Sequence, residues 1–343
     1  VVHGQGGTDT MFLAKALSQI TSINGQTRKE FNPMAIGDLP VHQGYAVDHI
    51  VLSNGNEIYF TGIERIEGES ASRLASSSVI ELLVTPNDPE FKDQWNLHVQ
   101  DVPSAWRFTT GSDEVLLVSL DTGVLPESTP EQVYGHLSDL SEHRLLTDPT
   151  DDENRSFVDY AYGHGHMAIS VMSSTPNNNE FVAGINWTSD VLVADVYDGP
   201  VSLQDAIQEA LAYAGQTGQK VVFQGGIQGE SWLTNGGSQQ ELEAILAASE
   251  ATAVYAVAAG NGGVEVDHIP DPGEDRNESG GVARLQAAHN NVIAVGAMQR
   301  EQEMVDGLAN ALDVKRAEYS NYGHGVTLMG ATDSRATYQF TGI

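Results

Sequence analysis

The feature of this sequence that most constrains its fold is a series of short, predominantly apolar runs that alternates with helix-like segments from residue 87 onward. The apolar runs are residues 115–120, 191–196, 221–223, 253–259 and 291–295, and the helix-like segments are residues 203–214 and 239–249. Strands without polar alternation are buried on both faces, and interleaved helices can cover those faces. The pattern therefore predicts an α/β fold with a doubly wound, mostly parallel sheet and helices on both faces.

The first part of the chain has a different pattern, which favours a small β-rich domain. Two alternating runs, His49–Leu52 and Glu57–Phe60, flank an Asn-Gly pair that tolerates the positive φ of a hairpin turn. A small, polar stretch follows at residues 68–78. Because a chain of 343 residues suggests two domains, we predict a β-rich module, a linker and an α/β domain at residues 1–68, 69–86 and 87–343.

The charge of the chain restricts its partners. Lys and Arg number 16 and Asp and Glu number 47, so the formal net charge is −31. Such a surface repels phosphate backbones and anionic headgroups, which argues against a nucleic-acid partner. The acidity has two interpretations, a solvated surface tolerated in a salty medium and carboxylates that hold hard cations such as Ca²⁺, and we expect both.

Absent residue types and segments exclude further classes. The sequence has no cysteine, which excludes disulfides, thiolate zinc sites and a cysteine nucleophile. No run approaches the roughly 20 apolar residues of a transmembrane helix, so no transmembrane segment is predicted. The opening VVHGQGG lacks the plan of a secretory signal, and we expect the chain to be a fragment or a processed form.

Three polar residues in glycine-rich surroundings carry the chemistry of this sequence. Asp121 ends an apolar strand, His164 lies between two glycines before a helix-capable run, and Asn261 directly follows an apolar strand. Taken singly, each has a structural interpretation: a turn or capping aspartate, a turn histidine or a metal pair with His166, and an asparagine in a left-handed turn. Since chemistry in such sheets lies beyond the carboxyl ends of the strands, their joint placement favours a catalytic site.

The segments around these residues resemble the subtilisin family of serine peptidases. Residues 120–123 (LDTG) resemble its aspartate motif, residues 163–167 (GHGHM) its histidine motif and residues 258–261 (AAGN) its oxyanion motif. Further similarity lies at residues 87–97, 103–106, 110–111, 292–297 and 319–323. The similarity covers roughly the last three-quarters of the chain and follows the Asp, His, Ser order of that class.

The resemblance implies a role for each matching residue. Asp121 would hold the imidazole of His164, which would be the general base toward serine and the general acid toward the leaving amine. Asn261 would stabilise the oxyanion. Substrate would lie extended along Gly225 and Gly226, although the local sequence Gln-Gly-Gly-Ile differs from the family's usual Ser-Leu-Gly.

The nucleophile of the family is not among the residues that match. The family's serine follows Gly-Thr and opens a buried helix, and residues 340–343 (FTGI) resemble the approach to that motif. We therefore expect the serine just after Ile343, supplied by a continuation or by a partner chain, and we expect the fragment alone to be inactive. Ser334 is a poor substitute because no small apolar helix follows it.

Two segments suggest calcium ligands. Residues 4–11 (GQGGTDTM) resemble one copy of the nonapeptide of RTX-type secreted calcium-binding proteins, which makes Asp9 a candidate ligand and export without a cleaved signal an expectation. The alternative is an ordinary glycine turn before a β-domain. Asp151 and Asp152 lie in a carboxylate-rich loop at residues 148–154, for which the alternative is a solvated face. We predict structural Ca²⁺.

The sequence thus predicts a secreted or surface-attached serine endopeptidase that acts on protein or peptide substrates at the cell surface or outside the cell. One alternative keeps the fold and drops the chemistry, leaving a truncated or catalytically silent family member that serves in binding or assembly. A second alternative is a calcium-stabilised adhesion or surface-layer component that carries the peptidase domain as a passenger.

Overall fold

A computed structural model describes most of the chain, and its residues form two compact units. The described residues are 2–3, 10–13, 20–27, 41–42, 45–61, 63, 65–68, 79–81, 84–124, 139–140, 145–146, 163–197, 201–227, 237–269, 279–300 and 314–332. Unit 1 comprises Val1–Pro86 and Asp101–Thr110, and unit 2 comprises Asn87–Gln100 and Gly111–Ile343. The chain therefore passes from unit 2 into unit 1 and back within residues 100–111.

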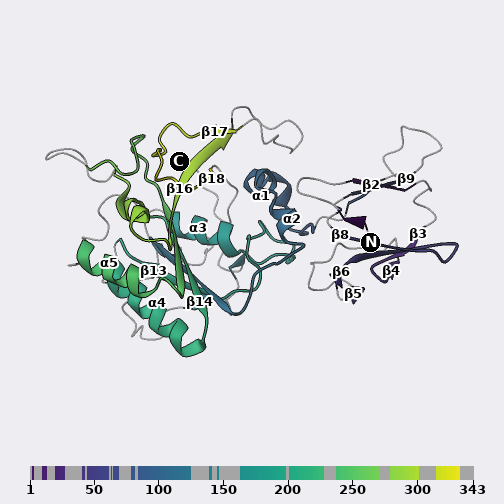
Figure 1. The fold of residues 1–343 in the computed structure, drawn as a ribbon, viewed down its shortest axis with the longest axis horizontal. Coiled ribbons are helices and arrows are strands. Elements are labelled where there is room, and N and C mark those ends of the chain that lie inside the picture. The colour runs from purple at the N-terminus through teal and green to yellow at the C-terminus, as the bar shows by residue number, and fades with distance from the viewer. Residues whose placement is uncertain are drawn as a thin grey trace, which may run out of the picture. The chain divides into compact units, whose positions relative to one another are not determined.

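The described elements of unit 1 are β-strands and one short helix (Figure 1). Its elements are β1 (Val2–His3), β2 (Thr10–Leu13), β3 (Ile20–Ile23), β4 (Gln26–Thr27), β5 (Val41–His42), β6 (Tyr45–Ala46), β7 (Asp48–Leu52), β8 (Glu57–Thr61), β9 (Arg65–Gly68), β10 (Val79–Glu81) and the short helix α2 (Val102–Ala105). The strands form sheets in the orders β1-β8-β7-β3-β4, β10-β9-β2 and β5-β6. Strands β7 and β8 pair antiparallel, and Gly55 between them has φ +83°, which confirms the predicted hairpin.

A buried ion pair lies in unit 1 beside its apolar core. Arg107 donates to the carboxylate of Asp48 and, at 2.5 Å, to the carbonyl oxygen of Ile63. Asn24 Nδ2 donates to the other oxygen of Asp48 at 2.8 Å. Burial raises the pKa of Asp48, and the positive charge of Arg107 opposes that rise. Segment 101–110 is thus attached to the strands of unit 1 by an ion pair that is almost fully buried.

Unit 2 is organised around one mostly parallel sheet of eight strands. Its strands are β11 (Val115–Asp121), β12 (Leu145–Leu146), β13 (Val191–Asp195), β14 (Lys220–Gly225), β15 (Ala253–Ala258), β16 (Val292–Arg300), β17 (Val314–Arg316) and β18 (Leu328–Ala331). The order is β12-β13-β11-β14-β15-β16-β17, with β18 also paired to β16, and only the β16–β17 pairing is antiparallel among the pairings of the described strands. Strand β11 therefore lies between two strands that follow it in the chain.

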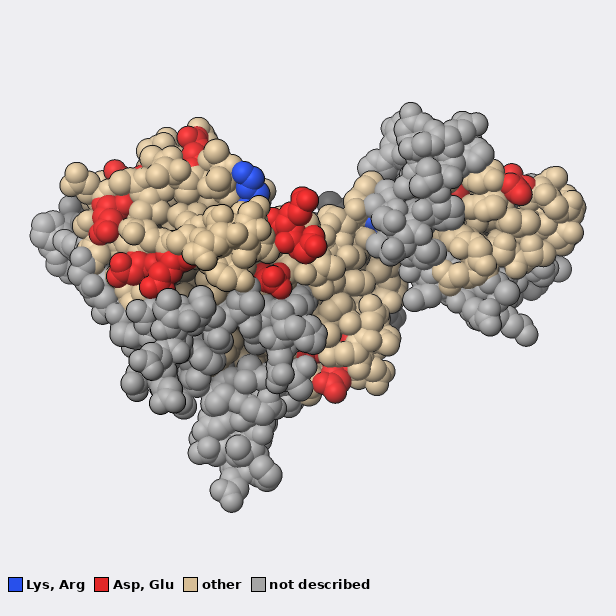
Figure 2. All heavy atoms as spheres, turned by 90° about the horizontal axis from the view of Figure 1, so that it is seen from below, with Lys and Arg blue, Asp and Glu red and all other residues tan. Residues whose placement is uncertain are grey.

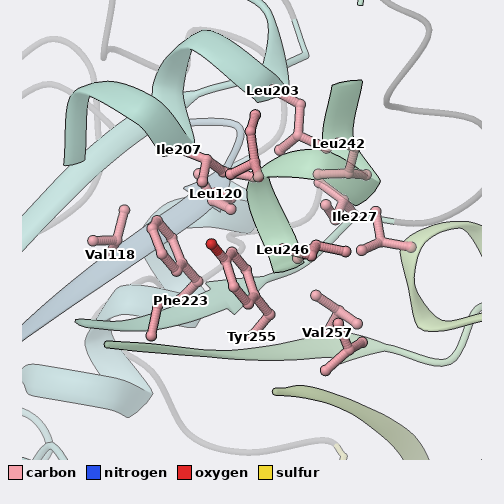
Figure 3. Close-up of a cluster of buried hydrophobic side chains, with 14 of the residues drawn as sticks. Val118, Leu120, Leu203, Ile207, Phe223, Ile227, Leu242, Leu246, Tyr255 and Val257 are labelled. Carbon is pink, nitrogen blue, oxygen red and sulfur yellow. The ribbon is translucent and has the colours of Figure 1, made fainter. Parts of the chain in front are cut away.

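Helices cover both faces of this sheet. The helices of unit 2 are η3 (Phe91–Asp93), α1 (Trp95–Val99), α3 (His164–Ser173), α4 (Leu203–Thr217), α5 (Gln239–Ala248) and η7 (Gly281–Ala287). Successive residues of β11 point to opposite faces, so Leu116, Val118 and Leu120 pack with α4 and α5, whereas Leu117 packs with Ile169 of α3. Figure 3 shows part of the first of these clusters, in which labelled side chains of β11, β14 and β15 point toward those of α4 and α5.

Local sequence signals set the ends of the two long helices. Ser202 caps α4 by accepting from the backbone N–H of Asp205 at 3.1 Å, and Ser238 caps α5 by accepting from the N–H of Glu241 at 3.3 Å. Helix α4 ends at Gly218, whose φ of +78° is the left-handed conformation that glycine adopts without strain.

The fold class predicted from the sequence is confirmed, namely a mostly parallel sheet with helices on both faces and a small β-rich module before it. The exact boundaries at 68 and 86 stay a prediction, and part of the predicted linker forms β10. Residues 4–9 of the RTX-like segment lie outside the described residues. Within the described ranges, no helix combines the length and hydropathy that spanning a membrane requires. Figure 2 shows groups of acidic side chains and few basic ones on the face drawn.

Candidate active site

The site lies where the order in which the chain adds strands to the sheet reverses. After β11 the chain adds β12 and β13 on one side and then β14 and β15 on the other, so the strand order switches at the carboxyl end of β11, the position at which sheets of this kind bind ligands. Leu120 pairs with Gly225, and Gly225 pairs with Val257. The residues that directly follow these positions, among them Asp121 and Gly226, therefore share one edge of the sheet.

A hydrogen-bonded carboxylate and imidazole form the centre of this edge. His164 Nδ1 lies 2.6 Å from Asp121 Oδ1, which also accepts from the backbone N–H of Thr122 at 2.8 Å. Asp121 is fully buried, whereas 56% of the His164 side chain is exposed. The carboxylate can thus fix the orientation of the ring while the rest of the imidazole stays open to a reactant.

The glycines around His164 explain how the ring reaches the carboxylate. Helix α3 begins at His164 directly after Gly163, which has φ +64°. A Cβ at Gly165 would overlap the carbonyl oxygen of Gly123, so only glycine allows the start of α3 to approach the strand end this closely. The backbone N–H of Gly165 donates to Thr122 Oγ1 at 2.9 Å, which ties the helix start to the residue after Asp121.

Gly226 closes the other side of the pair. A Cβ at this position would overlap Asp121 Oδ2 and would lie 2.9 Å from His164 Cε1. The Tyr197 hydroxyl donates to the Gly226 carbonyl oxygen at 3.1 Å and holds this backbone in place. Asp121 Oδ2 is buried and has no hydrogen-bond partner among the described residues. The structure therefore brings Asp121, His164 and Gly226 together.

The other two predicted site residues lie at the same sheet edge. Gly225 is the last residue of β14, and a Cβ there would lie 2.8 Å from Val257 Cγ1. Asn261 is exposed in the turn that follows β15. Its side chain is thus available to a bound molecule, at an edge that the strand pairing shares with Asp121.

His166 takes no part in a metal pair with His164. The two residues are separated by two positions on α3, a spacing at which helix side chains do not face each other. His166 is fully buried and His164 is largely exposed, so the metal-pair alternative is wrong. More broadly, the part of the chain that the structure describes contains no group of three His, Cys, Asp or Glu side chains placed to bind a metal.

A pair of buried aspartates in unit 2 was not identified from the sequence. Asn178 Nδ2 donates to one oxygen of Asp139 at 2.8 Å, and the backbone N–H of Asn177 donates to one oxygen of Asp88 at 3.0 Å. The second oxygen of each aspartate, Asp139 Oδ2 and Asp88 Oδ1, is buried without a hydrogen-bond partner in the described residues. This pair joins the start of unit 2 to the loop after α3.

Electrostatics also set Asp139 apart. Burial raises its pKa to about 7, the hydrogen bond from Asn178 opposes that rise, and the negative charge of Asp88 adds to it. Burial is likewise the main cause that raises the pKa of Asp88. The two carboxylate oxygens that have no partner are ligands of the kind that a hard cation prefers.

Several predicted residues cannot be placed. Asp9, Asp151, Asp152, Ser334 and Ile343 lie outside the described residues. Their assignment as calcium ligands, as a rejected nucleophile and as the residue before the expected serine therefore rests on sequence alone.

Comparison with known proteins gives a family match and a distant relative. The model of the subtilase family matches residues 112–337, which is more than half of the chain. The halolysin-like extracellular serine protease Nep of Natrialba magadii is 25% identical over 149 residues, which make up 43% of this chain. The matched region spans 27% of that relative's own length.

Solved structures of proteases have similar folds at low sequence identity. A protease from Pseudoalteromonas arctica is 19% identical with a TM-score of 0.46, and the match covers 72% of each chain. The serine protease in the Aeromonas sobria complex with a chaperone is 17% identical with a TM-score of 0.47, and the match covers 78% of this chain and 47% of that one.

Proposed function

The chain belongs to the subtilase family, and from this premise we propose that it is part of a serine endopeptidase that cleaves protein or peptide substrates. The observation that carries the proposal is the 2.6 Å hydrogen bond between buried Asp121 and the exposed imidazole of His164. This pair supplies the base and the group that orients it, which is what hydrolysis by a serine requires.

In the proposed mechanism His164 transfers the protons. Asp121 accepts from Nδ1, so the neutral ring presents the lone pair of Nε2 to a serine hydroxyl. The ring takes the hydroxyl proton as the serine oxygen attacks the scissile carbonyl, and it later gives that proton to the leaving amine. The buried carboxylate stabilises the imidazolium that forms between these two steps.

Asn261 and the end of β14 would bind the substrate. The exposed amide of Asn261 can donate to the oxyanion of the tetrahedral intermediate, an interaction worth about 10²- to 10³-fold in turnover for this enzyme class. Substrate would pair in extended form with the backbone at Gly225 and Gly226. Because a Cβ at Gly226 would overlap Asp121 Oδ2, this backbone can lie directly against the Asp121–His164 pair only with glycine at that position.

The nucleophile is proposed to be a serine that follows Ile343 in a longer polypeptide or belongs to a partner chain. A fluorophosphonate probe tests this directly because it reacts only with an activated serine. Full-length protein should be labelled at one serine located just after Ile343, and the His164→Ala variant should lose the label, since its serine has no base.

Two outcomes would contradict the serine assignment. Labelling at Ser334 would move the nucleophile into the present sequence. Absence of label on protein with intact secondary structure would favour the catalytically silent alternative, which acts in surface assembly or adhesion. Heat-denatured protein serves as the control for nonspecific labelling.

We place the protein outside the cell or at its surface. The relative from Natrialba magadii is described as extracellular, and the strongly acidic composition suits a salty medium. Residues 4–11 resemble the repeat of RTX-type secreted proteins, and this resemblance also supports export.

We also propose that Asp88 and Asp139 hold a structural calcium ion. Their unsatisfied oxygens would be two of the roughly six to eight oxygen ligands that Ca²⁺ takes, and a bound cation would favour the ionised carboxylates that burial disfavours. The ion would tie the start of unit 2 to the loop of residues 175–183, where Gln94 already bonds both backbone groups of Ala183. Asp9, Asp151 and Asp152 remain candidate ligands of further calcium ions.

Calcium should raise the melting temperature of this protein at pH 8. Saturation at a hundred-fold excess over Kd is worth about 2.7 kcal/mol, which corresponds to roughly 5–10 °C for a domain of this size. The Asp139→Asn variant should lose most of this calcium response. Differential scanning calorimetry with and without chelator measures both, and an unchanged response in the variant would exclude Asp139 as a ligand.

The pH dependence of the folding stability, measured in chelator, gives an independent check. Because the pKa of folded Asp139 is raised from 3.8 to about 7, the folded state holds a proton that the unfolded chain has released between these values. Stability from this group is therefore largest at acidic pH, declines as pH rises toward 7 and stays level above it. Asp139→Asn should flatten this decline.

A further inference from the structure

One buried side chain holds the turn that carries Asn261 from both sides. Asn321 is fully buried in the loop between β17 and β18. Its Nδ2 donates to the carbonyl oxygen of Ala259 at 2.9 Å, and its Oδ1 accepts from the backbone N–H groups of Gly262 and Val264 at 3.0 and 3.1 Å. These bonds attach to the chain two residues before Asn261 and one and three residues after it.

The backbone around Asn321 adds to this attachment. The N–H of Asn321 donates to the carbonyl oxygen of Gly260 at 2.9 Å. Gly260 has φ +102°, and a Cβ there would overlap Asn321 Nδ2. Position 260 must therefore adopt a left-handed conformation and must also leave space for the Asn321 amide. Only glycine meets both requirements.

The amide group is the chemical requirement at position 321. It must donate to a carbonyl and accept from two N–H groups at once, which asparagine does with a single short side chain. Aspartate would lack the donor and would place a charge in a buried site, and alanine would leave three backbone groups without partners. Asn261 itself stays exposed, so the turn is fixed through its neighbours while its amide remains free to meet substrate.

We infer that Asn321 is a positioning residue that fixes the Asn261 amide for oxyanion stabilisation. This inference rests on the proposed peptidase function. Preorganised donors stabilise charge that develops in the transition state because they need no rearrangement during the reaction. A turn released from Asn321 would let the Asn261 amide move, which lowers turnover without removing any group that touches substrate.

The first test does not depend on activity. Hydrogen exchange in the full-length protein should show the amides of Gly262 and Val264 exchanging at least about tenfold faster in Asn321→Ala than in wild type. Asn291→Ala is the matched control, because Asn291 is also a buried asparagine whose Nδ2 bonds a carbonyl, that of Leu246, at 3.0 Å. The control should leave both amides unchanged.

The second test asks whether Asn321 acts through Asn261. In Asn321→Ala, kcat for a peptide substrate should fall about 10- to 100-fold with little change in KM. Added to an Asn261→Ala background, the same change should cost less than about threefold, because the group it positions is already gone. If Asn321→Ala fails to fold, Asn321→Ser, which keeps a hydroxyl able to donate or accept, takes its place in both tests.

The outcomes separate this inference from the proposed function. Unchanged exchange at Gly262 and Val264, or a full multiplicative loss in the Asn261→Ala background, would overturn the positioning role. Wild-type protein without peptidase activity would overturn the proposed function, and the exchange measurement would still decide whether Asn321 holds the turn.

Discussion

Asp121→Asn should lower kcat/KM for peptide hydrolysis about 10⁴-fold, the loss typical of this substitution in serine peptidases. The carboxylate accepts from His164 Nδ1 at 2.6 Å and from the Thr122 N–H at 2.8 Å through the same oxygen. Asparagine can offer one oxygen to both donors but carries no negative charge, so the imidazolium that forms during proton transfer loses its stabilising partner. Steady-state kinetics on a peptide substrate measure the loss.

Asp195→Asn is the matched control for this prediction. Asp195 pairs with Asp121 across β11 and β13, and its carboxylate accepts from the Tyr197 N–H at 3.0 Å. An asparagine oxygen can accept that bond equally well, so activity should change only a few-fold. Equal losses in the two variants would show that any change at this strand end disturbs the site, and would remove the case for Asp121 as the group that orients the base.

Arg107→Met should destabilise unit 1 by about 3–5 kcal/mol, because removing one partner of a buried ion pair leaves the other uncompensated. Asp48 would lose the positive charge that opposes the effect of burial on its pKa, and Ile63 would lose the donor to its carbonyl oxygen. Hydrogen exchange in the β7–β8 hairpin should accelerate roughly a hundred-fold or more. Exchange in β11 and β14 of unit 2 serves as the internal reference.

The double variant Arg107→Met, Asp48→Asn tests the reason for this loss. Asparagine removes the buried charge and can still accept from Asn24, so the double variant should recover part of the lost stability. If the double variant is less stable than Arg107→Met alone, the charge of Asp48 is not the source of the effect. The packing of the arginine stem would then be the dominant contribution.

The sheet of unit 2 could be predicted because its signal is local. Each strand is a short run buried on both faces, and each predicted run lies within or beside an observed strand, as residues 115–120 do in β11. The helix-like segment predicted at residues 203–214 lies within α4, which extends to Thr217 and is flanked directly by a serine cap and a glycine. Contacts among neighbours in the chain suffice for both.

The Asp121–His164 pair could be predicted from the sequence because the carboxyl ends of parallel strands lie at the same edge of the sheet. An acid at the end of β11 and a histidine at the start of the following helix are brought to one edge by topology, although 43 positions separate them. The roles of Gly225, Gly226 and Asn261 stay predictions, because position at that edge does not by itself show contact with substrate.

The supporting contacts could not be predicted, because they join backbone and side chains across long stretches of chain. Asn321 bonds backbone groups about 60 positions earlier, and Arg107 pairs with Asp48 across 59 positions. Asp139 lies beside Asn178 in space but 39 positions away in sequence. None of these residues belongs to a periodic pattern, and an isolated buried asparagine or arginine has no signature in sequence.

Gly165, Gly226 and Gly260 have a practical consequence for anyone who wishes to redesign this cleft. At each of them a methyl group would intrude on the strand end, the Asp121 carboxylate or the Asn321 amide. In saturation libraries centred on Asp121, His164 and Asn261, many variants would carry substitutions at these glycines, where an added side chain overlaps neighbouring atoms. Efforts to change the substrate preference of the proposed peptidase would do better to vary positions at which an added side chain meets no neighbouring atom.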